Sequence, residues 1–356
     1  MRRLVLDLAD RRPVWSMPDW VEPELAAALP EGWEVVRIAE PTDGAGDGAG
    51  PLRAEVLEAV AGAEIYLGYG VPPELLEAGK KLRWVHTAAA GVARSLSRAM
   101  LASEVVFTNS AGVHGPPIAE TVLGMLLFFF RGLDLAVAEP ARSRWHQEPW
   151  LRADTPVREL AGSTVGIVGY GGIGREVARR VASLGARVIA LARRERTASP
   201  LGPLAGGGDL SDVVRVVRGA EGLDELLGAS DAVVITVPET PETRGLIDER
   251  ALARAKPGAV LVNVARGSIV DEDALARALS EGRLRGAGLD VFAKEPLPER
   301  HPFYTLPNVL VTPHVSGVTA GFWRREMDLI LRNLARYLRG APLEEWENVV
   351  DKRAGY

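Results

Sequence analysis

The stretch Thr164–Gly174 reads TVGIVGYGGIG and joins an apolar, strand-like run to a G-x-G-x-x-G pattern. In this pattern Gly169 permits a tight turn, Gly171 lets the backbone approach a pyrophosphate, and Gly174 allows the next helix to pack closely on the strand. Free N–H groups and the dipole at the start of that helix hold phosphate charge. Glycines alone are weak evidence, but a helical pattern and a further apolar run (residues 186–191) follow them. The stretch therefore predicts a dinucleotide-binding β-α-β unit.

Strand-like and helix-like segments alternate through almost the whole chain, which is typical of parallel α/β proteins. A first set predicts strands at 4–6, 34–38, 64–67, 83–85 and 105–107, with helices near 22–29, 52–61 and 73–79. A second set predicts strands near 164–169, 187–192, 231–236, 259–264 and 286–291. A chain of 356 residues is long for one core, so we expect two domains.

Two long helical patterns, residues 116–138 and 318–339, bracket the second set. This arrangement predicts a chain that leaves the first domain, builds the nucleotide domain, and returns. We expect the catalytic cleft between the domains, with the two helices as its hinges.

The composition narrows the classes of partner. The chain is 47% hydrophobic and 25% charged, as in an ordinary globular enzyme, and its formal net charge of -5 provides no basic field for nucleic acid or an anionic membrane. The absence of cysteine excludes disulfides, thiolate catalysis and cysteine-based metal sites, and we assign no metal. The N-terminal apolar run is too short for a secretory signal, and residues 118–130 are too few to cross a bilayer. We expect a cytoplasmic protein with small-molecule partners.

Two glycine-rich stretches, residues 42–50 and 201–209, predict surface loops. The first lacks the lysine and Ser/Thr of a phosphate-binding P-loop, so we assign it no function.

Three polar residues follow predicted strands and suggest chemistry. Arg266 follows the strand at 259–264, and Glu295 follows the strand at 286–291. His314 comes after the apolar run that begins at Val309. Taken alone, His314 fits a structural histidine, and Arg266 and Glu295 fit solvated loop charges. Ligands in open α/β sheets bind outside the carboxyl ends of the strands, however, and all three converge there.

This combination suits hydride transfer between a nicotinamide and a carbon that bears oxygen. A ketone that accepts hydride needs a proton on its oxygen, and a histidine is the usual donor. A carboxylate beside that histidine favours the imidazolium, a role that Glu295 fits. The fixed fork of Arg266 can hold a carboxylate and polarise the adjacent carbonyl. The substrate predicted is a 2-oxo acid.

Five motifs in order, GYGGIG, VPETPETRGLI, NVARGSIVDE, GAGLDVFAKEP and TPHVSG, show that the chain resembles the D-isomer-specific 2-hydroxyacid dehydrogenase family from about residue 60 to 340. That family includes glyoxylate/hydroxypyruvate reductases, D-lactate dehydrogenases and phosphoglycerate dehydrogenases. The resemblance implies a Rossmann dinucleotide-binding domain (116–317) inserted into a flavodoxin-like parallel α/β substrate domain (1–115 and 318–356).

The resemblance also implies roles for individual residues. Arg266 binds and polarises the substrate, Glu295 tunes the histidine, and His314 is the acid/base. The implied cofactor-binding residues are Gly169, Gly171, Gly172, Ile173 and Gly174 at the pyrophosphate, Val237, Pro238, Thr243 and Val264 along the cofactor, and Asp290 at the nicotinamide carboxamide. The backbone N–H groups of Ala90 and Gly91 match the loop that holds the substrate carboxylate.

One position departs from the pattern of NAD-using proteins. About 20 residues beyond the glycine motif, an acid normally binds the ribose hydroxyls, but Ala192 stands there, followed by Arg193 and Arg194. Paired arginines can receive a 2′-phosphate, so we expect NADP to be preferred over NAD. The alternative is that both arginines are solvated and that Glu195 reaches the ribose.

The prediction is an NAD(P)H-dependent reduction of a small, glyoxylate- or hydroxypyruvate-like 2-oxo acid to the D-2-hydroxy acid. A phosphoglycerate dehydrogenase-like activity and a non-catalytic dinucleotide-sensing scaffold remain as alternatives. By resemblance, formate dehydrogenases carry glutamine where Glu295 stands, which excludes them. A homodimer is expected from the resemblance and because the helix at 118–130 is apolar on nearly every side, although the chain's own domains could also cover it.

Overall fold

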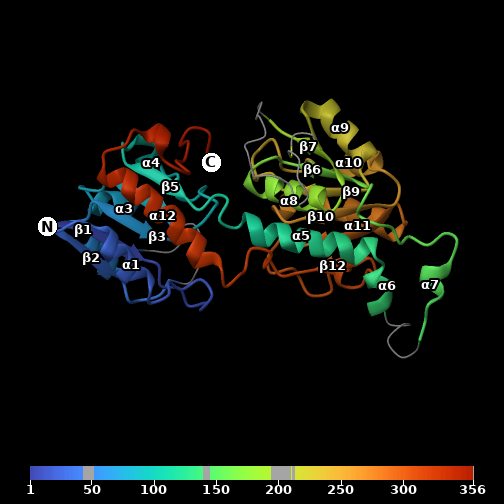
Figure 1. Cartoon of the computed structure of the whole chain (residues 1–356), viewed down its shortest axis with the longest axis horizontal. Coiled ribbons are helices and arrows are strands. Elements are labelled where there is room, and N and C mark those ends of the chain that lie inside the picture. The colour runs from blue at the N-terminus through green and yellow to red at the C-terminus, as the bar shows by residue number, and fades with distance from the viewer. Residues whose placement is uncertain (43–51, 139–144, 194–209, 211–212, 356) are drawn as a thin grey trace. The chain divides into compact units, whose positions relative to one another are not determined.

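The computed structural model describes residues 1–42, 52–138, 145–193, 210 and 213–355. The chain divides into two compact units (Figure 1). The first contains Met1–His114 and Val318–Tyr356, and the second contains Gly115–Gly317.

The first unit is a parallel sheet covered by helices on both faces. Its strands are β1 (Arg2–Asp7), β2 (Trp33–Arg37), β3 (Ile65–Gly68), β4 (Trp84–Thr87) and β5 (Val106–Asn109). Its helices are α1 (Val21–Ala28), α2 (Ala54–Val60), α3 (Pro73–Ala78), α4 (Arg98–Ala102) and α12 (Phe322–Leu338), with a 3₁₀ turn η5 (Leu343–Glu345). The strand order β2-β1-β3-β4-β5 is that of flavodoxin-like folds. Alternate side chains of β1 face opposite ways: Leu4 and Leu6 pack with α1 and α12, and Val5 packs with α2 and α3.

The second unit contains a seven-stranded parallel sheet. Its strands are β6 (Thr164–Val168), β7 (Arg187–Leu191), β8 (Val214–Val217), β9 (Ala232–Ile235), β10 (Ala259–Asn263), β11 (Leu284–Leu289) and β12 (Val309–Val311). Its helices are α5 (Gly115–Phe130), α6 (Leu133–Val137), α7 (Glu148–Leu151), α8 (Gly172–Ser183), α9 (Gly219–Ala229), α10 (Glu249–Arg254) and α11 (Glu272–Ser280), with 3₁₀ turns η3 (Gly267–Ile269) and η4 (Pro302–Tyr304).

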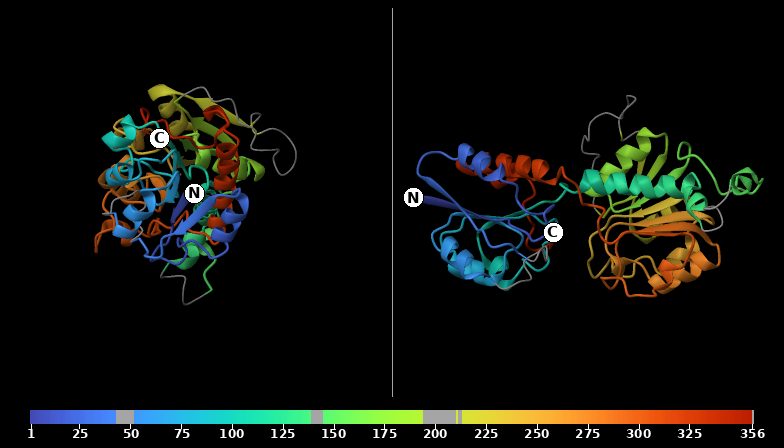
Figure 2. Two further views of the ribbon diagram at one scale, coloured as in Figure 1. Left: turned by 90° about the vertical axis from the view of Figure 1, so that its left-hand side faces the viewer. Right: turned by 90° about the horizontal axis from the view of Figure 1, so that it is seen from below.

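The order β12-β11-β10-β9-β6-β7-β8 contains the six-strand Rossmann order and adds β12 at one edge. The hydrophobic cores lie on the two faces of this sheet. Helices α5 and α8 supply one core, and α9, α10 and α11 supply the other. In the right-hand view of Figure 2, teal α5 and orange α11 lie on opposite faces of the sheet. The expected fold class, a Rossmann unit with a flavodoxin-like parallel unit, is confirmed.

The structure differs from the expected elements in two places. Strand β8 was not predicted, because its four residues form a short, half-exposed edge strand with Arg215 in the middle. The helix expected over 116–138 is broken into α5 and α6. Gly132 lies between them with φ 67°, a left-handed conformation that ends a helix. The glycine-rich stretch at 201–209 lies outside the described residues, as does all of 42–50 except Thr42.

Among the helices that the structure describes, none has both the length and the apolar character needed to span a bilayer.

Candidate active site

The glycine motif forms a tight turn between β6 and α8. Gly169 has φ 108°, which side-chain-bearing residues rarely adopt. A Cβ atom on Gly174 would lie 2.1 Å from the carbonyl oxygen of Gly169, so only glycine fits there. At Gly171 a Cβ atom would meet no atom within 4 Å. The turn therefore requires its first and last glycines, and it leaves its middle glycine open to a ligand.

The start of α8 fits an anionic group. Gly171 is the N-cap and supplies no side-chain hydrogen bond, and the first turn contains no acidic residue. The first N–H groups of a helix lack intrahelical acceptors and bind phosphates. The amides of Gly172 and Ile173 lie in this first turn. The site therefore fits the pyrophosphate of a dinucleotide.

The turn after β9 lies against the glycine motif. The hydroxyl of Thr236 donates to the Gly169 carbonyl at 2.7 Å, and a Cβ atom on Gly169 would lie 2.8 Å from the Val237 nitrogen. The Thr243 hydroxyl donates to the Pro238 carbonyl at 2.7 Å and closes the turn. Val237 thus lies against the glycine motif, and the bond between Thr243 and Pro238 shapes the turn that follows. Val264, by contrast, has its side chain buried in the core beside α5.

Ala192 and Arg193 follow β7. Ala192 is buried, and its N–H donates to the Val217 carbonyl at 3.1 Å. Arg193 is exposed. The pKa of Glu242 is lowered, first by a hydrogen bond with Thr240 and also by the charge of Arg193, so Arg193 lies within electrostatic reach of the turn after β9. Arg194 and Glu195 lie outside the described residues.

His314 and Glu295 are in direct contact. Nδ1 of His314 lies 2.7 Å from Oε2 of Glu295, and both side chains are partly exposed. The other Glu295 oxygen accepts from the Phe292 amide at 3.0 Å. Because a carboxylate accepts hydrogen bonds, we assign a proton to Nδ1, which leaves Nε2 for a reacting group.

Asp290 organises the loop that carries His314. Its side chain is fully buried. Its carboxylate accepts from the Thr312 hydroxyl at 2.6 Å, the Val315 amide at 2.9 Å and the Ser316 amide at 3.0 Å. The contact with the nicotinamide carboxamide that the resemblance implies for Asp290 stays a prediction. Asp290 also holds the loop of His314 in place, a role that sequence reasoning missed.

Arg266 lies in a loop that packs on the segment leading to Glu295. Asn263 donates to the Arg266 carbonyl at 3.0 Å and thereby shapes the loop. A Cβ atom on Gly267 would lie 1.9 Å from the Phe292 carbonyl carbon, so only glycine allows this close backbone approach. The Arg266 side chain is exposed. Three predicted residues, Arg266, Glu295 and His314, therefore lie on interlocked loops at the carboxyl ends of β10, β11 and β12.

In the first unit, Ala90 and Gly91 lie in an exposed loop after β4. Among the described residues, their N–H groups find no acceptor. Asn109 and Ser110 support this loop from the end of β5, since they donate to the carbonyls of Ala90 (2.8 Å) and Ala89 (3.2 Å), respectively. Sequence reasoning missed both supports. The signal for them was a polar T-N-S run directly after a strand.

A second missed cluster lies at the carboxyl end of β1. The Tyr66 hydroxyl donates to the carboxylate of Asp7 at 2.8 Å, and Arg53 forms an ion pair with the same carboxylate. Asp7 is buried. Arg53 lies at the start of α2, where the sequence indicated only a helix.

Comparison with known proteins identifies the family. A family model described as "D-isomer specific 2-hydroxyacid dehydrogenase, NAD binding domain" matches residues 123–316. A D-3-phosphoglycerate dehydrogenase of Mycobacterium bovis is 37% identical over 311 residues, 86% of this chain and 53% of that protein, so the chain spans about half of that relative's length. A glyoxylate reductase of Thermofilum pendens is 32% identical over 295 residues, 82% of this chain and 83% of that protein.

Among solved structures, an NADPH-dependent glyoxylate/hydroxypyruvate reductase of Sinorhizobium meliloti, in complex with NADP and sulfate, is 29% identical with a TM-score of 0.73 and covers both chains completely. These similarities agree with the glycine turn between β6 and α8 and with the loops that follow β10, β11 and β12. The chain belongs to the D-isomer specific 2-hydroxyacid dehydrogenase family.

Proposed function

We propose that the protein reduces a small 2-oxo acid of the glyoxylate or hydroxypyruvate type to the D-2-hydroxy acid with NAD(P)H. The observation that carries this proposal is the contact between His314 Nδ1 and Glu295 Oε2 at 2.7 Å, on the unit whose glycine turn fits a dinucleotide. A solvated histidine needs no such partner. A histidine that donates a proton during reduction must carry a positive charge, and it needs a partner of this kind.

Bound nicotinamide supplies the hydride that the carbonyl carbon accepts. His314 donates its proton to the carbonyl oxygen as negative charge develops there. Glu295 orients the imidazole through Nδ1 and stabilises its protonated form by a charge-assisted hydrogen bond. The Arg266 guanidinium binds the substrate carboxylate and polarises the carbonyl.

The amides of Ala90 and Gly91 supply further donors to the carboxylate. Successive backbone N–H groups form anion-binding concavities, and these two have no acceptor among the described residues. A carboxylate on the substrate satisfies them.

One observation, at the strand ends of the first unit, supports an unphosphorylated substrate. The residues that end β1, β3, β4 and β5 are Asp7, Gly68, Thr87 and Asn109, and none is a cation. The guanidinium of Arg53 lies at this edge, but the buried Asp7 balances its charge. A phosphate is recognised by uncompensated cations and strong donors. Phosphoglycerate dehydrogenase-like activity is the second candidate, because the Mycobacterium bovis relative is 37% identical.

Steady-state assays of NADPH and NADH oxidation test the proposal, with glyoxylate, hydroxypyruvate, pyruvate and 3-phosphohydroxypyruvate as substrates. We expect kcat/KM for glyoxylate or hydroxypyruvate to exceed that for the phosphorylated acid by at least about 10-fold, the effect of roughly one unmatched charged contact. The reverse order would establish the second candidate. Binding of dinucleotide without turnover of any of the four acids would favour the non-catalytic scaffold.

We also propose that NADP is preferred over NAD. Three observations support this: Ala192 removes the acid that would repel a 2′-phosphate, Arg193 is exposed just beyond β7, and the Sinorhizobium meliloti relative is NADPH-dependent.

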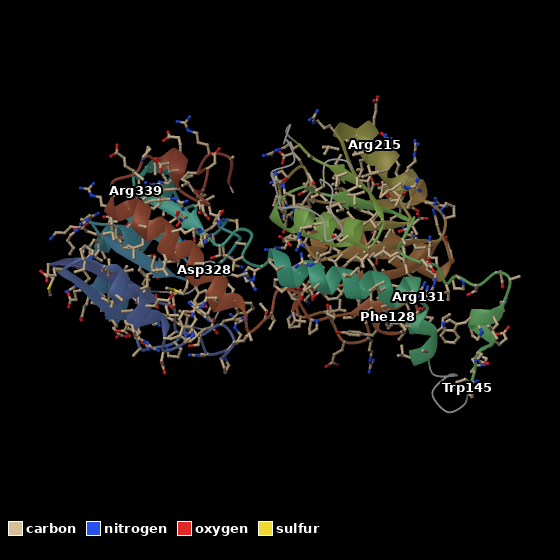
Figure 3. All side chains as sticks on the ribbon, viewed as in Figure 1. Phe128, Arg131, Trp145, Arg215, Asp328 and Arg339 are labelled. Carbon is tan, nitrogen blue, oxygen red and sulfur yellow. The ribbon has the colours of Figure 1, made fainter. Side chains whose placement is uncertain are left out.

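We also propose that the protein forms a homodimer. Most of the apolar surface of α5 is covered by its own unit, so that helix supports the dimer less than its sequence suggested. The support comes instead from exposed apolar side chains of α6, α7 and the segment before α7: Leu133, Val137, Trp145 and Leu151. Figure 3 labels Trp145, which is 86% exposed. Trp145 and Leu151 line one hollow together, and contiguous exposed apolar surface is typical of a protein interface.

A further inference from the structure

The C-terminal tail adds a short antiparallel pairing to the edge strand β5. Val349 bridges Thr108, and the Val350 amide donates to the Phe107 carbonyl at 2.8 Å. The Asn109 amide donates to the Asn348 carbonyl at 3.2 Å. An exposed strand edge is commonly covered in this way. The pairing fixes Asn348 beside the end of β5.

The side chain of Asn348 holds the segment that follows β5. Its amide nitrogen donates to the Asn109 carbonyl at 3.1 Å and to the Ala111 carbonyl at 2.7 Å. Asn348 has φ 56°, in the left-handed region that asparagine tolerates better than most residues. The backbone conformation and both donors together anchor residues 109–111.

Residues 109 and 110 in turn aim the amides of Ala90 and Gly91, which have no acceptor among the described residues. In a planar trans peptide the C=O and N–H groups point in opposite directions. The side chain of Asn109 binds the Ala90 carbonyl, so the Gly91 N–H must point away from Asn109. The Ser110 amide binds the Ala89 carbonyl, which directs the Ala90 N–H in the same manner. A hydrogen bond to the carbonyl also polarises its peptide and strengthens the N–H as a donor.

We propose that Asn348 is a positioning residue for substrate binding, which acts through Asn109 on the amides of Ala90 and Gly91. The inference rests on the proposed function, because it assumes that these amides hold the substrate carboxylate. It adds a residue 239 positions away from Asn109 in sequence and assigns the C-terminal tail a part in substrate affinity.

The test uses the full chain with Asn348→Gly, Asn348→Asp and Lys352→Ala. Glycine tolerates the positive φ, so Asn348→Gly removes the two donors and leaves the backbone conformation available. Aspartate has the same shape but no donor. The control, Lys352→Ala, removes bonds from Nζ to the carbonyls of Ser103 and Val105 (both 2.8 Å), which anchor the same tail without contacting residues 109–111.

We expect Asn348→Gly and Asn348→Asp to raise the KM for glyoxylate and the Kd for oxalate by about 3- to 10-fold, the scale of one lost neutral hydrogen bond. The KM for NADPH should stay unchanged, and so should every constant of Lys352→Ala. If Lys352→Ala and Asn348→Gly changed the glyoxylate and oxalate constants equally, any loss of tail anchoring would explain the effect. That result would overturn the proposal. Unchanged glyoxylate and oxalate constants in Asn348→Gly would also overturn it.

Oxalate binding, measured by calorimetry on the NADP(H)-saturated protein, separates this inference from the proposed function. An enzyme that turns over no 2-oxo acid, but whose oxalate affinity falls in Asn348→Gly alone, would contradict the proposed reaction and support the positioning role. A wild type that neither binds oxalate nor reduces a 2-oxo acid would overturn both.

Discussion

At the scale of single residues, hydrogen bonds constrain the backbone around His314. Its φ of 55° is uncommon for a residue with a side chain and costs conformational energy. The His314 amide donates to the Asp290 carbonyl at 2.8 Å, and the Asp290 carboxylate holds the residues on either side. Glu295 then fixes the ring. The fold thus maintains one orientation of a partly exposed imidazole.

His314→Gln should lower kcat by at least about 100-fold, the usual scale for loss of a general acid. Glu295→Gln should lower it less, because glutamine can still accept from Nδ1 but no longer stabilises the imidazolium by charge. Dinucleotide affinity, measured by fluorescence titration, should change little in either variant. Near-normal turnover of His314→Gln would remove His314 from the mechanism.

The proposed preference for NADP is tested at the end of β7. Arg193→Ala should lower kcat/KM for NADPH by about 10- to 100-fold, the effect of losing one charge-assisted hydrogen bond, and leave NADH kinetics unchanged. Ala192→Asp should reverse the preference, since a carboxylate repels a 2′-phosphate. Arg187→Ala, at the other end of the same strand, is the matched control and should be silent. A wild type that prefers NADH would contradict this assignment.

At the scale of elements, one carboxylate ties the C-terminal tail to α12. Glu347 accepts from Arg332 and Arg336, each at 2.8 Å. The hydrogen bond from Arg332 is the main reason that the pKa of Glu347 lies below its ordinary value of 4.5. A carboxyl group whose pKa is lowered in the folded state stabilises the fold above the unfolded pKa, and this contribution is lost as pH falls through the folded pKa.

Glu347→Gln should therefore lower Tm at neutral pH, where the folded state gains from the ionised carboxylate. The Tm difference between variant and wild type should shrink as pH falls below about 4.5. Thermal unfolding followed by circular dichroism between pH 7 and pH 3 measures it. A Tm difference that is constant over this range would mean that the ion pairs do not stabilise the tail.

At the scale of the whole molecule, we expect a dimer built on α6, α7 and the segment before α7. Light scattering should report about twice the chain mass of 38.2 kDa. A double variant, Trp145→Ser with Leu151→Ser, should shift the protein toward the monomer. Leu343→Ser, an equally polar change at an exposed leucine of η5, should not. A wild type that is monomeric at micromolar concentration would overturn the proposed homodimer.

Local sequence patterns predicted much of the fold and the three candidate catalytic residues. The glycine turn, the apolar runs and the polar residues that directly follow strands are local features, and parallel strands bring their carboxyl ends to one edge. Arg266, Glu295 and His314 could be predicted for this reason. Strand β8 and the break at Gly132 could not, because a four-residue edge strand and a single left-handed glycine leave weak signals.

Only the tertiary structure decided which groups support the predicted ones. Asp290 binds residues 312–316, Asp7 binds Arg53 and Tyr66, and Asn348 reaches Asn109 across 239 positions of sequence. Periodicity in a sequence specifies which face of an element is buried, but not which strand becomes its neighbour or in what register. These hydrogen bonds depend on strand order and register, so they exist only once the sheets have formed.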